Sequence, residues 1–460
     1  MIRSLLSAVI GSTCLLAAST ACSRDSAPSP EDIARAIQQE AGAYVKTGKT
    51  DALSIAVVYE GKTQYFNFGT TARGKQQTPS QDTVYEIGSV SKTFTGLLLA
   101  HALVDHKAKA SDDIRRYMQG AYPNLELKGT PITLSNLVTT TSGLPDNLPD
   151  IMGVFKTAGP AKAPFIVIDM LGHYSTKTLL EDLHKVALES QPGSTPKHSN
   201  VATELLGSLL EKIDGRPYDE QLATRIEKPL GMKSGLSKDR LPQMATGYSD
   251  DGTVMPLLLA PVVRAAGGLR YSSSDMARYV SAQLDVSDPA IQLTHQPALG
   301  DPDSQAIGFH WTISKTVDGN AHLSHGGGTF GFSSYVDMYP DAHYGMGQVA
   351  RHRRTGACPG RARLSACGWH RETRAAALSQ TASDRGLHQQ LGIPVAEGWA
   401  HEGRGRHPGI QHRQPSAERK CFRQSRRSLP RGGRPRTIGG QLSALAAAQP
   451  RQHACKGSAG

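Results

Sequence analysis

The hydrophobic pattern begins with a helical repeat just after residue 30. Pro30 stands where the first turn of a helix tolerates a residue that has no N–H to donate. The apolar residues that follow recur every three or four positions, as on the buried stripe of a helix: Ile33, Ala34, Ile37, Ala41, Tyr44 and Val45. The pattern therefore predicts a helix that opens the fold.

Runs of β-branched and aromatic residues come next. Residues 54–59 and 63–68 flank a turn that contains Gly61, which predicts a β-hairpin. Three more strands are expected much later in the chain, at 308–314, 321–324 and 333–339. In the last of them Tyr335 and Asp337 alternate with apolar residues, as on a strand that is buried on one face.

The segment between about 100 and 260 is mainly helical in pattern. Its clearest helix covers residues 200–213, where six apolar residues share one stripe: Val201, Leu205, Leu206, Leu209, Leu210 and Ile213. Strands at both ends with helices between them predict an α+β fold, in which distant parts of the chain close one antiparallel sheet around a helical insertion.

Charge divides the 460-residue chain into two unequal parts. The net charge is +11, yet residues 351–460 alone contain 19 Arg and 2 Lys against 5 acidic residues. The first 350 residues are therefore slightly acidic, which excludes a basic nucleic-acid-binding body. The Arg-rich segment has no apolar periodicity, so we expect no hydrophobic core there.

Cysteine is absent between Cys22 and Cys358. This gap excludes a disulfide scaffold, a thiol nucleophile and a Cys-ligated metal from the body of the protein. Cys358, Cys367 and His370 suggest zinc only superficially, because the remaining cysteines have no finger-like spacing. We expect neither a metal nor a cofactor.

The first 21 residues have the features of a bacterial export signal. Arg3 is followed by an apolar stretch over residues 5–18 and by small residues up to Ala21. Residues 22–30 are then a linker. Two outcomes stay open: lipidation of Cys22, which would tether the protein to a membrane, and cleavage after Ala21, which would release it into the periplasm. We expect a periplasmic monomer.

The strongest chemical pattern is Ser89-Val-Ser-Lys92, followed by an apolar helical run. A serine at a helix start has its Oγ at the positive end of the helix dipole, and a lysine three residues later lies on the same face. A desolvated lysine has a depressed pKa, so Lys92 can take the proton of Ser89 without histidine. The alternative is an ordinary helix-capping serine, and the same spacing recurs at Ser194 and Lys197 without a following apolar turn.

Two further segments contain polar or glycine-rich candidates. His198 and Asn200 lie in a turn before the predicted 200–213 helix, where a plain helix cap is the simpler interpretation. The segment from His325 through Gly327 and Gly328 lies between two predicted strands. It also fits G-x-G-x-x-G, but a strand follows instead of a helix, which argues against a dinucleotide site. The N–H of Gly328 could instead pair with that of Ser89 as an oxyanion hole.

Together these motifs resemble the penicillin-recognising serine hydrolases, specifically the class C β-lactamases and related D-alanyl-D-alanine peptidases and esterases, over residues 33–346. The segment 88–96 is nearly identical to the nucleophile motif of class C enzymes. His325-Gly-Gly327 resembles a variant of the Lys-Thr-Gly element, and Asn147 falls where the family places an amide that binds the acyl group. The family's Tyr-x-Asn motif is replaced here by His198-Ser-Asn200.

The resemblance implies a serine hydrolase that forms an acyl-enzyme on Ser89 with β-lactams, D-Ala-D-Ala peptides or small esters. Lys92 and His198 would share the proton transfers, while Asn200 and Asn147 orient the substrate and His325 lines the pocket near its carboxylate. Imidazole can replace the phenol in acid–base work, but potent β-lactam turnover becomes doubtful. The rival hypothesis is a penicillin-binding protein that acylates without turnover, or an inactive remnant.

The serine hydrolase domain is expected to cover 31–346, and residues 347–460 are expected to have no fold of their own. Up to residue 350 Lys outnumbers Arg 18 to 12, after which Arg outnumbers Lys 19 to 2. A shifted reading of GC-rich codons near Gly347 would produce such a change, at the cost of a buried strand and a C-terminal helix. A nucleic-acid-binding arm is the other interpretation; we do not expect it, because an exported protein seldom meets nucleic acid.

Overall fold

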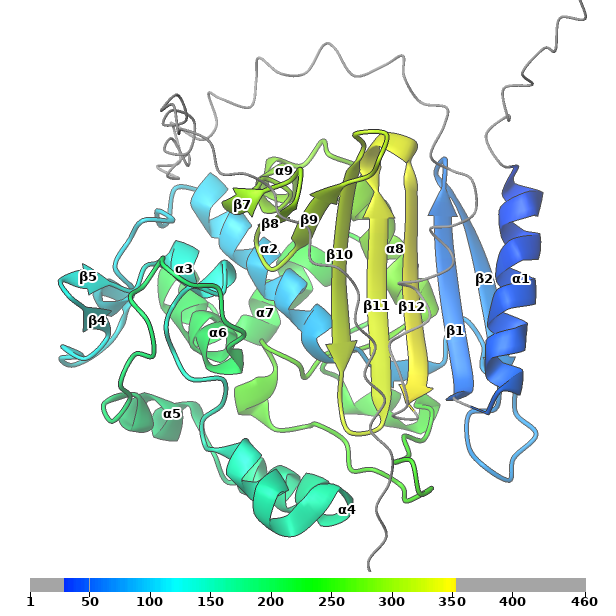
Figure 1. The fold of residues 1–460 in the computed structure, drawn as a ribbon, viewed down its shortest axis with the longest axis horizontal. Helices are drawn as coiled ribbons and strands as arrows, with labels where there is room; N and C mark the ends of the chain where they lie inside the picture. The colour runs from blue at the N-terminus through cyan, green and yellow to red at the C-terminus, as the bar shows by residue number, and fades with distance from the viewer. Residues whose placement is uncertain (1–28, 49, 353–460) are drawn as a thin grey trace, which may run out of the picture. The chain divides into compact units, whose positions relative to one another are not determined.

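The computed structural model describes residues 29–48 and 50–352. Its main element is an eight-stranded antiparallel sheet with strand order β2-β1-β12-β11-β10-β9-β8-β7 (Figure 1). The strands are β1 (Thr50–Tyr59), β2 (Lys62–Gly69), β7 (Leu299–Asp301), β8 (Gln305–Ile307), β9 (Thr312–Lys315), β10 (Ala321–Gly328), β11 (Phe332–Tyr339) and β12 (Tyr344–His352). The N-terminal hairpin thus joins strands from beyond residue 298, which confirms the predicted α+β architecture.

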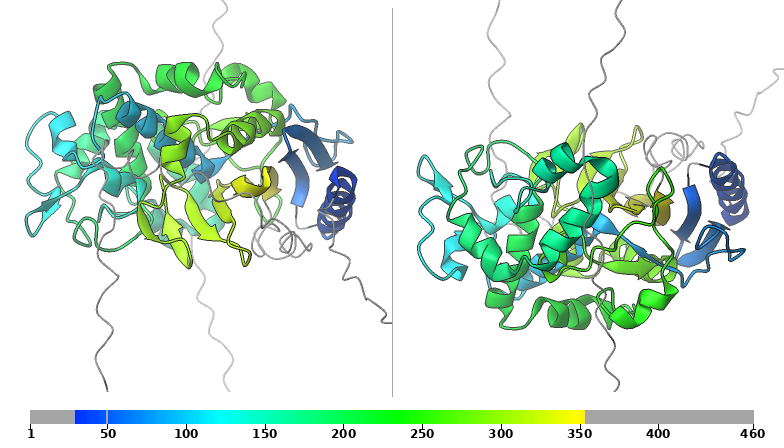
Figure 2. Two further views of the ribbon diagram at one scale, coloured as in Figure 1. Left: turned by 90° about the horizontal axis from the view of Figure 1, so that it is seen from above. Right: turned by 90° about the horizontal axis from the view of Figure 1, so that it is seen from below.

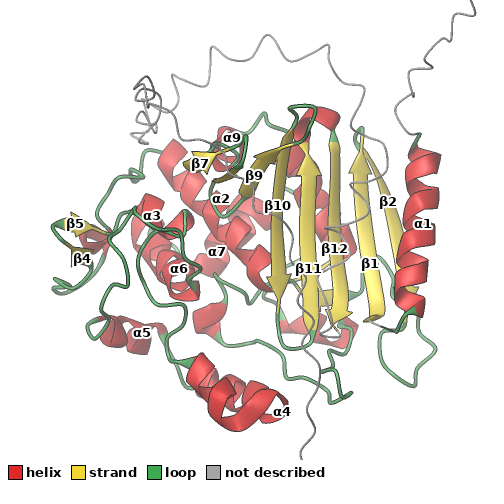
Figure 3. Cartoon of the chain, viewed as in Figure 1, coloured by secondary structure: helices red, strands yellow, loops and turns green. Residues whose placement is uncertain are grey.

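The helix α1 precedes the first strand, and the other helices lie in the interval between these two sets of strands (Figure 3). They are α1 (Pro30–Lys46), α2 (Ser91–Val104), α3 (Leu134–Val138), α4 (Ile151–Gly172), α5 (Thr176–Leu183), α6 (Asn200–Asp214), α7 (Tyr218–Leu222), α8 (Ser273–Leu284) and α9 (Pro289–Thr294). Two small ladders accompany them, β3 (Val84–Glu86) with β6 (Arg270–Ser272), and β4 (Glu126–Leu127) with β5 (Thr130–Pro131). The predicted helices at 30–45 and 200–213 are both confirmed.

The helix α1 begins at the expected proline and covers the outer face of the sheet beside β1 and β2 (Figure 2). Ser29 caps it in a reciprocal capping box with Asp32. Its apolar stripe packs with Leu53, Ile55 and Val57 of β1 in a small core that is separate from the main one. Because β1 is covered on both faces, nearly every one of its residues is buried.

The strand β12 corrects the expected domain end at residue 346. It pairs with β1 on one side and β11 on the other through residue 351 or beyond, and Met346, Val349 and Ala350 are buried. The expectation that residues after 347 supply no buried strand is therefore wrong: the strand is buried as far as Ala350. Sequence reasoning failed here because Gly345 and Gly347 weaken the strand pattern. They face α8, where a Cβ on Gly345 would come within 2.5 Å of Val280.

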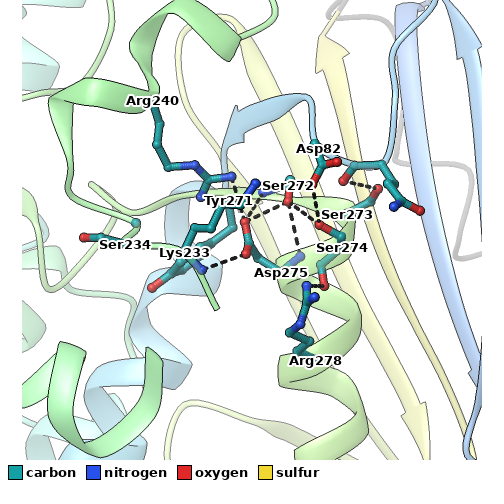
Figure 4. Close-up of polar contacts among 12 residues, drawn as sticks. Asp82, Lys233, Ser234, Arg240, Tyr271, Ser272, Ser273, Ser274, Asp275 and Arg278 are labelled. Atoms are coloured by element: carbon teal, nitrogen blue, oxygen red, sulfur yellow. Dashed lines mark hydrogen bonds and ion pairs between the residues drawn. The ribbon is translucent and has the colours of Figure 1, made fainter. Parts of the chain in front are cut away.

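A buried ion pair fixes the start of α8 against the preceding loop (Figure 4). Asp275 accepts hydrogen bonds from the Ser272 hydroxyl at 2.7 Å and from the Lys233 amide at 2.9 Å. Arg240 lies 2.9 Å from the same carboxylate, and both side chains are almost inaccessible to solvent. A buried carboxylate with one cation and several donors is satisfied in this position. The contact holds α8 in place under β12.

The bounds of β9 and β10 differ from the sequence prediction. The strand expected over 308–314 begins only at Thr312, because His310 takes a left-handed conformation with φ of 65°. The strand expected over 321–324 continues to Gly328, so the glycines belong to the sheet. The expectations for residues 1–28, including the export signal and Cys22, and for 353–460 lie outside the described residues.

Candidate active site

Ser89 lies in a single 3₁₀ turn, Gly88–Val90, that leads directly into α2. The first N–H groups of such a turn have no partner within the helix, so they are free to act as donors. Gly88 has a φ of 49°, and a Cβ there would come within 2.5 Å of the Gly328 amide nitrogen. The nucleophile turn is therefore pressed against the end of β10, and only glycine permits this approach.

Lys92 points from α2 toward Ser89 and is surrounded by acceptors. Its Nζ donates to the Ser89 Oγ at 2.8 Å, to the Asn200 Oδ1 at 2.7 Å and to the Ala266 carbonyl oxygen at 2.9 Å. The side chain is 3% exposed. The sequence predicted the Ser89 contact from helical spacing, whereas Ala266 arrives from a loop 174 positions later in the chain.

Burial gives Lys92 the character of a base. Desolvation lowers its pKa to about 8, although the negative charges of Glu204 and Asp146 oppose this shift. At neutral pH a fraction of roughly one tenth is therefore the free amine, far more than for an ordinary lysine. The hydrogen bond to Ser89 aims that amine at the hydroxyl proton, as nucleophile activation requires.

An unbroken series of hydrogen bonds leads away from Lys92. The Asn200 amide nitrogen donates to the Asn147 Oδ1 at 2.9 Å, and the Asn147 amide nitrogen donates to the Asp146 Oδ2 at 2.9 Å. Ser199 caps α6 and so fixes Asn200 at its first position. Both asparagines line the cavity that contains Ser89. The structure thus brings together Ser89, Lys92, Asn147 and Asn200.

His198 occupies a different position from the one that its proposed proton transfers require. Its Nδ1 lies 2.6 Å from the Asp146 Oδ1, and its side chain is 56% exposed. No hydrogen bond joins it to Ser89 or Lys92 in the described part of the chain. It lines a neighbouring cavity of about 270 Å³ together with Lys92, His310 and His325. The structure places His198 near the proton-transfer residues but not in contact with their reacting atoms.

The glycines of β10 form the wall opposite α2. A Cβ on Gly327 would collide with the Ile87 carbonyl oxygen and lie 2.9 Å from the Ser89 amide nitrogen. Gly328 lines the cavity beside Ser89. This close approach places the glycines of β10 beside the Ser89 amide, so the N–H groups of Ser89 and Gly328 can serve as the two donors of an oxyanion hole.

His325 and His310 are neutral at physiological pH. Burial, together with the nearby charge of Lys92, lowers the pKa of His325 to about 3. Burial also holds the pKa of His310 well below its usual range. Among the residues that the structure describes, nothing hydrogen-bonds to the buried His325 Nδ1 or to the buried His310 Nε2. His325 lines the neighbouring cavity with Lys92 and His198, not the cavity beside Ser89, and its imidazole is uncharged there.

Sequence reasoning missed Glu204, which lines the same cavity as Ser89 and Asn200. This cavity, of about 270 Å³, is otherwise mainly apolar, with Leu148 and Phe330 among its walls. Burial raises the pKa of Glu204 to about 8. A detectable signal existed: Glu204 interrupts the apolar stripe of the 200–213 helix, where a charged residue is unexpected.

Comparison with known proteins identifies the family to which this arrangement belongs. The Beta-lactamase family model matches residues 35–363, which is most of the chain. The chain belongs to the beta-lactamase family. The match also extends beyond the 33–346 that the motifs suggested, in agreement with the position of β12 inside the sheet.

Individual members of the beta-lactamase family resemble the chain at moderate identity. A Pseudomonas fluorescens beta-lactamase is 30% identical over 271 residues, which span 58% of this chain and 66% of the relative. The Escherichia coli (strain K12) D-alanyl-D-alanine-carboxypeptidase/endopeptidase AmpH is 27% identical over 307 residues, covering 63% and 76%. A crystal structure of a beta-lactamase/D-alanine carboxypeptidase from Pseudomonas syringae shares the fold, with a TM-score of 0.58, 23% identity and coverage of 70% and 94%.

Proposed function

We infer that the protein is a serine hydrolase of the class C β-lactamase and D-alanyl-D-alanine carboxypeptidase type, acting through an acyl-enzyme on Ser89. One observation supports this above all: a buried lysine with a lowered pKa donates to the nucleophile Oγ at 2.8 Å. Substrates would be β-lactams, D-Ala-D-Ala peptides or small esters, all of which present a reactive carbonyl carbon.

The steps of acylation follow from the positions of Ser89, Lys92, Asn147 and Asn200. The free amine of Lys92 takes the hydroxyl proton of Ser89 while the Oγ bonds to the substrate carbonyl carbon. The negative charge that develops on the carbonyl oxygen is stabilised by the N–H groups of Ser89 and Gly328. As the tetrahedral intermediate collapses, Lys92 returns the proton to the leaving nitrogen or oxygen. Asn147 and Asn200 hold the acyl side of the substrate.

A second candidate is a penicillin-binding protein that acylates but turns over slowly. The exposed position of His198 favours it, because the imidazole is bonded to Asp146 instead of to the nucleophile. Deacylation needs an activated water, and His198 would have to leave Asp146 to provide one. Burst-only acylation, with no steady-state phase, distinguishes this candidate from the hydrolase.

Labelling with a fluorescent penicillin tests the assignment of the nucleophile. We expect one covalent adduct per chain, mapped by mass spectrometry to the peptide that contains Ser89, and no adduct in Ser89→Ala. An adduct elsewhere, or labelling that persists in the variant, would refute the proposal. A panel of nitrocefin, a D-Ala-D-Ala peptide and p-nitrophenyl acetate then identifies the preferred substrate class.

We also propose export to the periplasm, supported by the sequence of the first 21 residues. Cys22 decides between a lipid tether and a soluble protein. Metabolic labelling with a palmitate analogue separates the two: incorporation that disappears in Cys22→Ala supports the tether, and cleavage after Ala21 without incorporation supports the soluble form.

A further inference from the structure

Glu204 lies one helical turn beyond Asn200 on α6, and both residues line the cavity that contains Ser89. Residues four apart on a helix share a face, so the Glu204 side chain and the Asn200 amide lie on the same side of α6. The Asn200 amide nitrogen donates to Asn147, the other amide that the proposed function assigns to the acyl side of the substrate. Glu204 therefore lies in the part of the cavity that the acyl group of a substrate would occupy.

The cavity wall around Glu204 is mainly apolar. Part of it is formed by α4, through Ile151, Val167 and Leu171. Phe330, from the turn between β10 and β11, forms another part. Among the described residues that line this cavity, Glu204 is the only one that can carry a charge, and none is a lysine, arginine or histidine. A substrate acyl group would therefore meet an apolar surface that contains a single acid.

Glu204 differs from the other buried acids because it has no partner among the described residues. It is 7% exposed, yet within residues 29–48 and 50–352 no group donates a hydrogen bond to its carboxyl and no cation forms an ion pair with it. The other buried acids in these ranges all have hydrogen-bond partners: Glu86, Asp112, Glu227, Asp275 and Asp337. A buried polar group without a partner is costly and needs an explanation. We therefore expect the occupant of the cavity to supply the partner of Glu204.

We propose that Glu204 determines the specificity for the acyl group: it selects substrates whose acyl group carries a primary ammonium, which donates a hydrogen bond to the carboxylate inside the cavity. This inference rests on the proposed acyl-enzyme function and names its substrate class, the amino-acyl β-lactams, esters and amides. Charge complementarity favours an ammonium over a neutral donor, because a buried carboxylate needs a cation and the described cavity wall provides none.

The electrostatics of the cavity agrees with this proposal. Burial raises the pKa of Glu204 to about 8, and the charge of Lys92 offsets only part of this shift. The acid is therefore mostly neutral at pH 7 when the cavity is empty. An ammonium would favour the carboxylate, so the pair forms as Glu204 releases its proton to solvent. An uncharged acyl group of the same shape would leave the carboxyl unpaired, and this difference discriminates between the two substrates.

Ampicillin and benzylpenicillin test the proposal, because their acyl side chains differ by one amino group. At about pH 6.5, where an α-amino group is protonated, we expect the second-order rate constant for acylation of Ser89 to be about 10–100-fold larger for ampicillin, the contribution of a hydrogen bond to a charged group. In Glu204→Gln, which keeps the side-chain volume and removes the charge, this preference should fall to a few-fold or less. Equal rate constants for the two penicillins in the wild type, or an unchanged preference in the variant, would overturn the proposal.

Binding without reaction separates this inference from the proposed function. Ser89→Ala cannot form an acyl-enzyme, so titration calorimetry with this variant measures the affinity for each penicillin alone. A lower Kd for ampicillin, lost in the double variant Ser89→Ala/Glu204→Gln, supports the inference. Equal Kd values, or no binding of ampicillin, overturn it even if the wild type acylates. If neither penicillin acylates the wild type, the proposed function fails, while the calorimetric comparison still decides the role of Glu204.

Glu211→Gln is the matched control, since it makes the same change on the same helix. Glu211 accepts hydrogen bonds from Arg264 and from the Tyr218 amide, and it does not line the catalytic cavity. The preference for ampicillin should be the same as in the wild type. An equal loss of preference in this variant would show that any lost charge on α6 weakens the selection of ampicillin, and the specific role of Glu204 would be refuted.

Discussion

Gly327 and Ser89 are far apart in the sequence and lie in direct backbone proximity: a Cβ on Gly327 would stand 2.9 Å from the Ser89 amide nitrogen and would also strike the Ile87 carbonyl oxygen. The strand β10 and the nucleophile turn can approach this closely only because that Cβ is missing. The proposed oxyanion hole depends on this approach, since its two N–H groups come one from each segment.

Gly327→Ala should therefore separate β10 from the nucleophile turn. We expect acylation of Ser89 to fall roughly 10²–10³-fold, the usual effect of losing one oxyanion donor. Gly326→Ala is the control, because a Cβ there meets nothing nearer than the Tyr335 ring at 3.5 Å, an ordinary van der Waals contact. Rapid-mixing measurements compare the acylation rates of the two variants. Equal rates would contradict the proposed role of Gly327 in the wall opposite α2.

Lys92→Ala should slow acylation by roughly 10²–10⁴-fold, as expected when a general base is lost. In the wild type the base is the free amine, so acylation should increase as pH rises through about 8, where burial places the pKa of Lys92. Lys197→Ala is the matched control, since Lys197 repeats the Ser-x-x-Lys spacing after Ser194 but pairs with Glu189 at the surface. A flat pH profile would exclude Lys92 as the base.

His198→Tyr restores the phenol of the family motif in place of an imidazole that Asp146 holds. We expect deacylation to become faster, toward the roughly 10²–10⁴-fold that a positioned acid–base group contributes. Release of labelled penicilloate from the acyl-enzyme measures this step directly. If the substitution changes deacylation with no substrate, His198 is a loop residue without an acid–base role.

Arg240→Ala should destabilise the fold by about 3–5 kcal/mol, because Asp275 would remain buried without its cation. Chemical denaturation measures the change in unfolding free energy. Lys185→Ala removes a solvent-exposed ion pair with Asp182 and should leave the unfolding free energy nearly unchanged. A similarly small loss of unfolding free energy in both variants would show that the ion pair between Arg240 and Asp275 does not stabilise the fold.

We propose a shift of reading frame in the gene as the cause of the abrupt change from Lys to Arg. Since β12 pairs up to His352, the change of frame should fall after that codon instead of near Gly347. We expect one alternate frame downstream of codon 352 to encode an amphipathic helix and then a stop. If neither frame does, the Arg-rich segment is genuine, and a salt-dependent mobility shift with single-stranded DNA would test the alternative of a binding arm.

The sequence by itself predicted the elements whose signals are local. Helical periodicity predicted α1 and α6, runs of β-branched and aromatic residues around a Gly-containing turn predicted β1 and β2, and alternation predicted β11. The Ser-x-x-Lys spacing placed Lys92 beside Ser89. Each of these signals depends on residues a few positions apart. The extent of β12 was missed for the same reason: its glycines suit the packing of α8, which no local pattern records.

Only the tertiary structure decided how the site works. Desolvation of Lys92, the raised pKa of Glu204 and the neutral state of His325 all depend on segments that meet from distant parts of the chain. His198 shows this most directly, since its motif position implied proton transfer, whereas Asp146 binds its ring at the surface. Burial and charge act through space, so the sequence named the reactive residues while the fold determined their protonation.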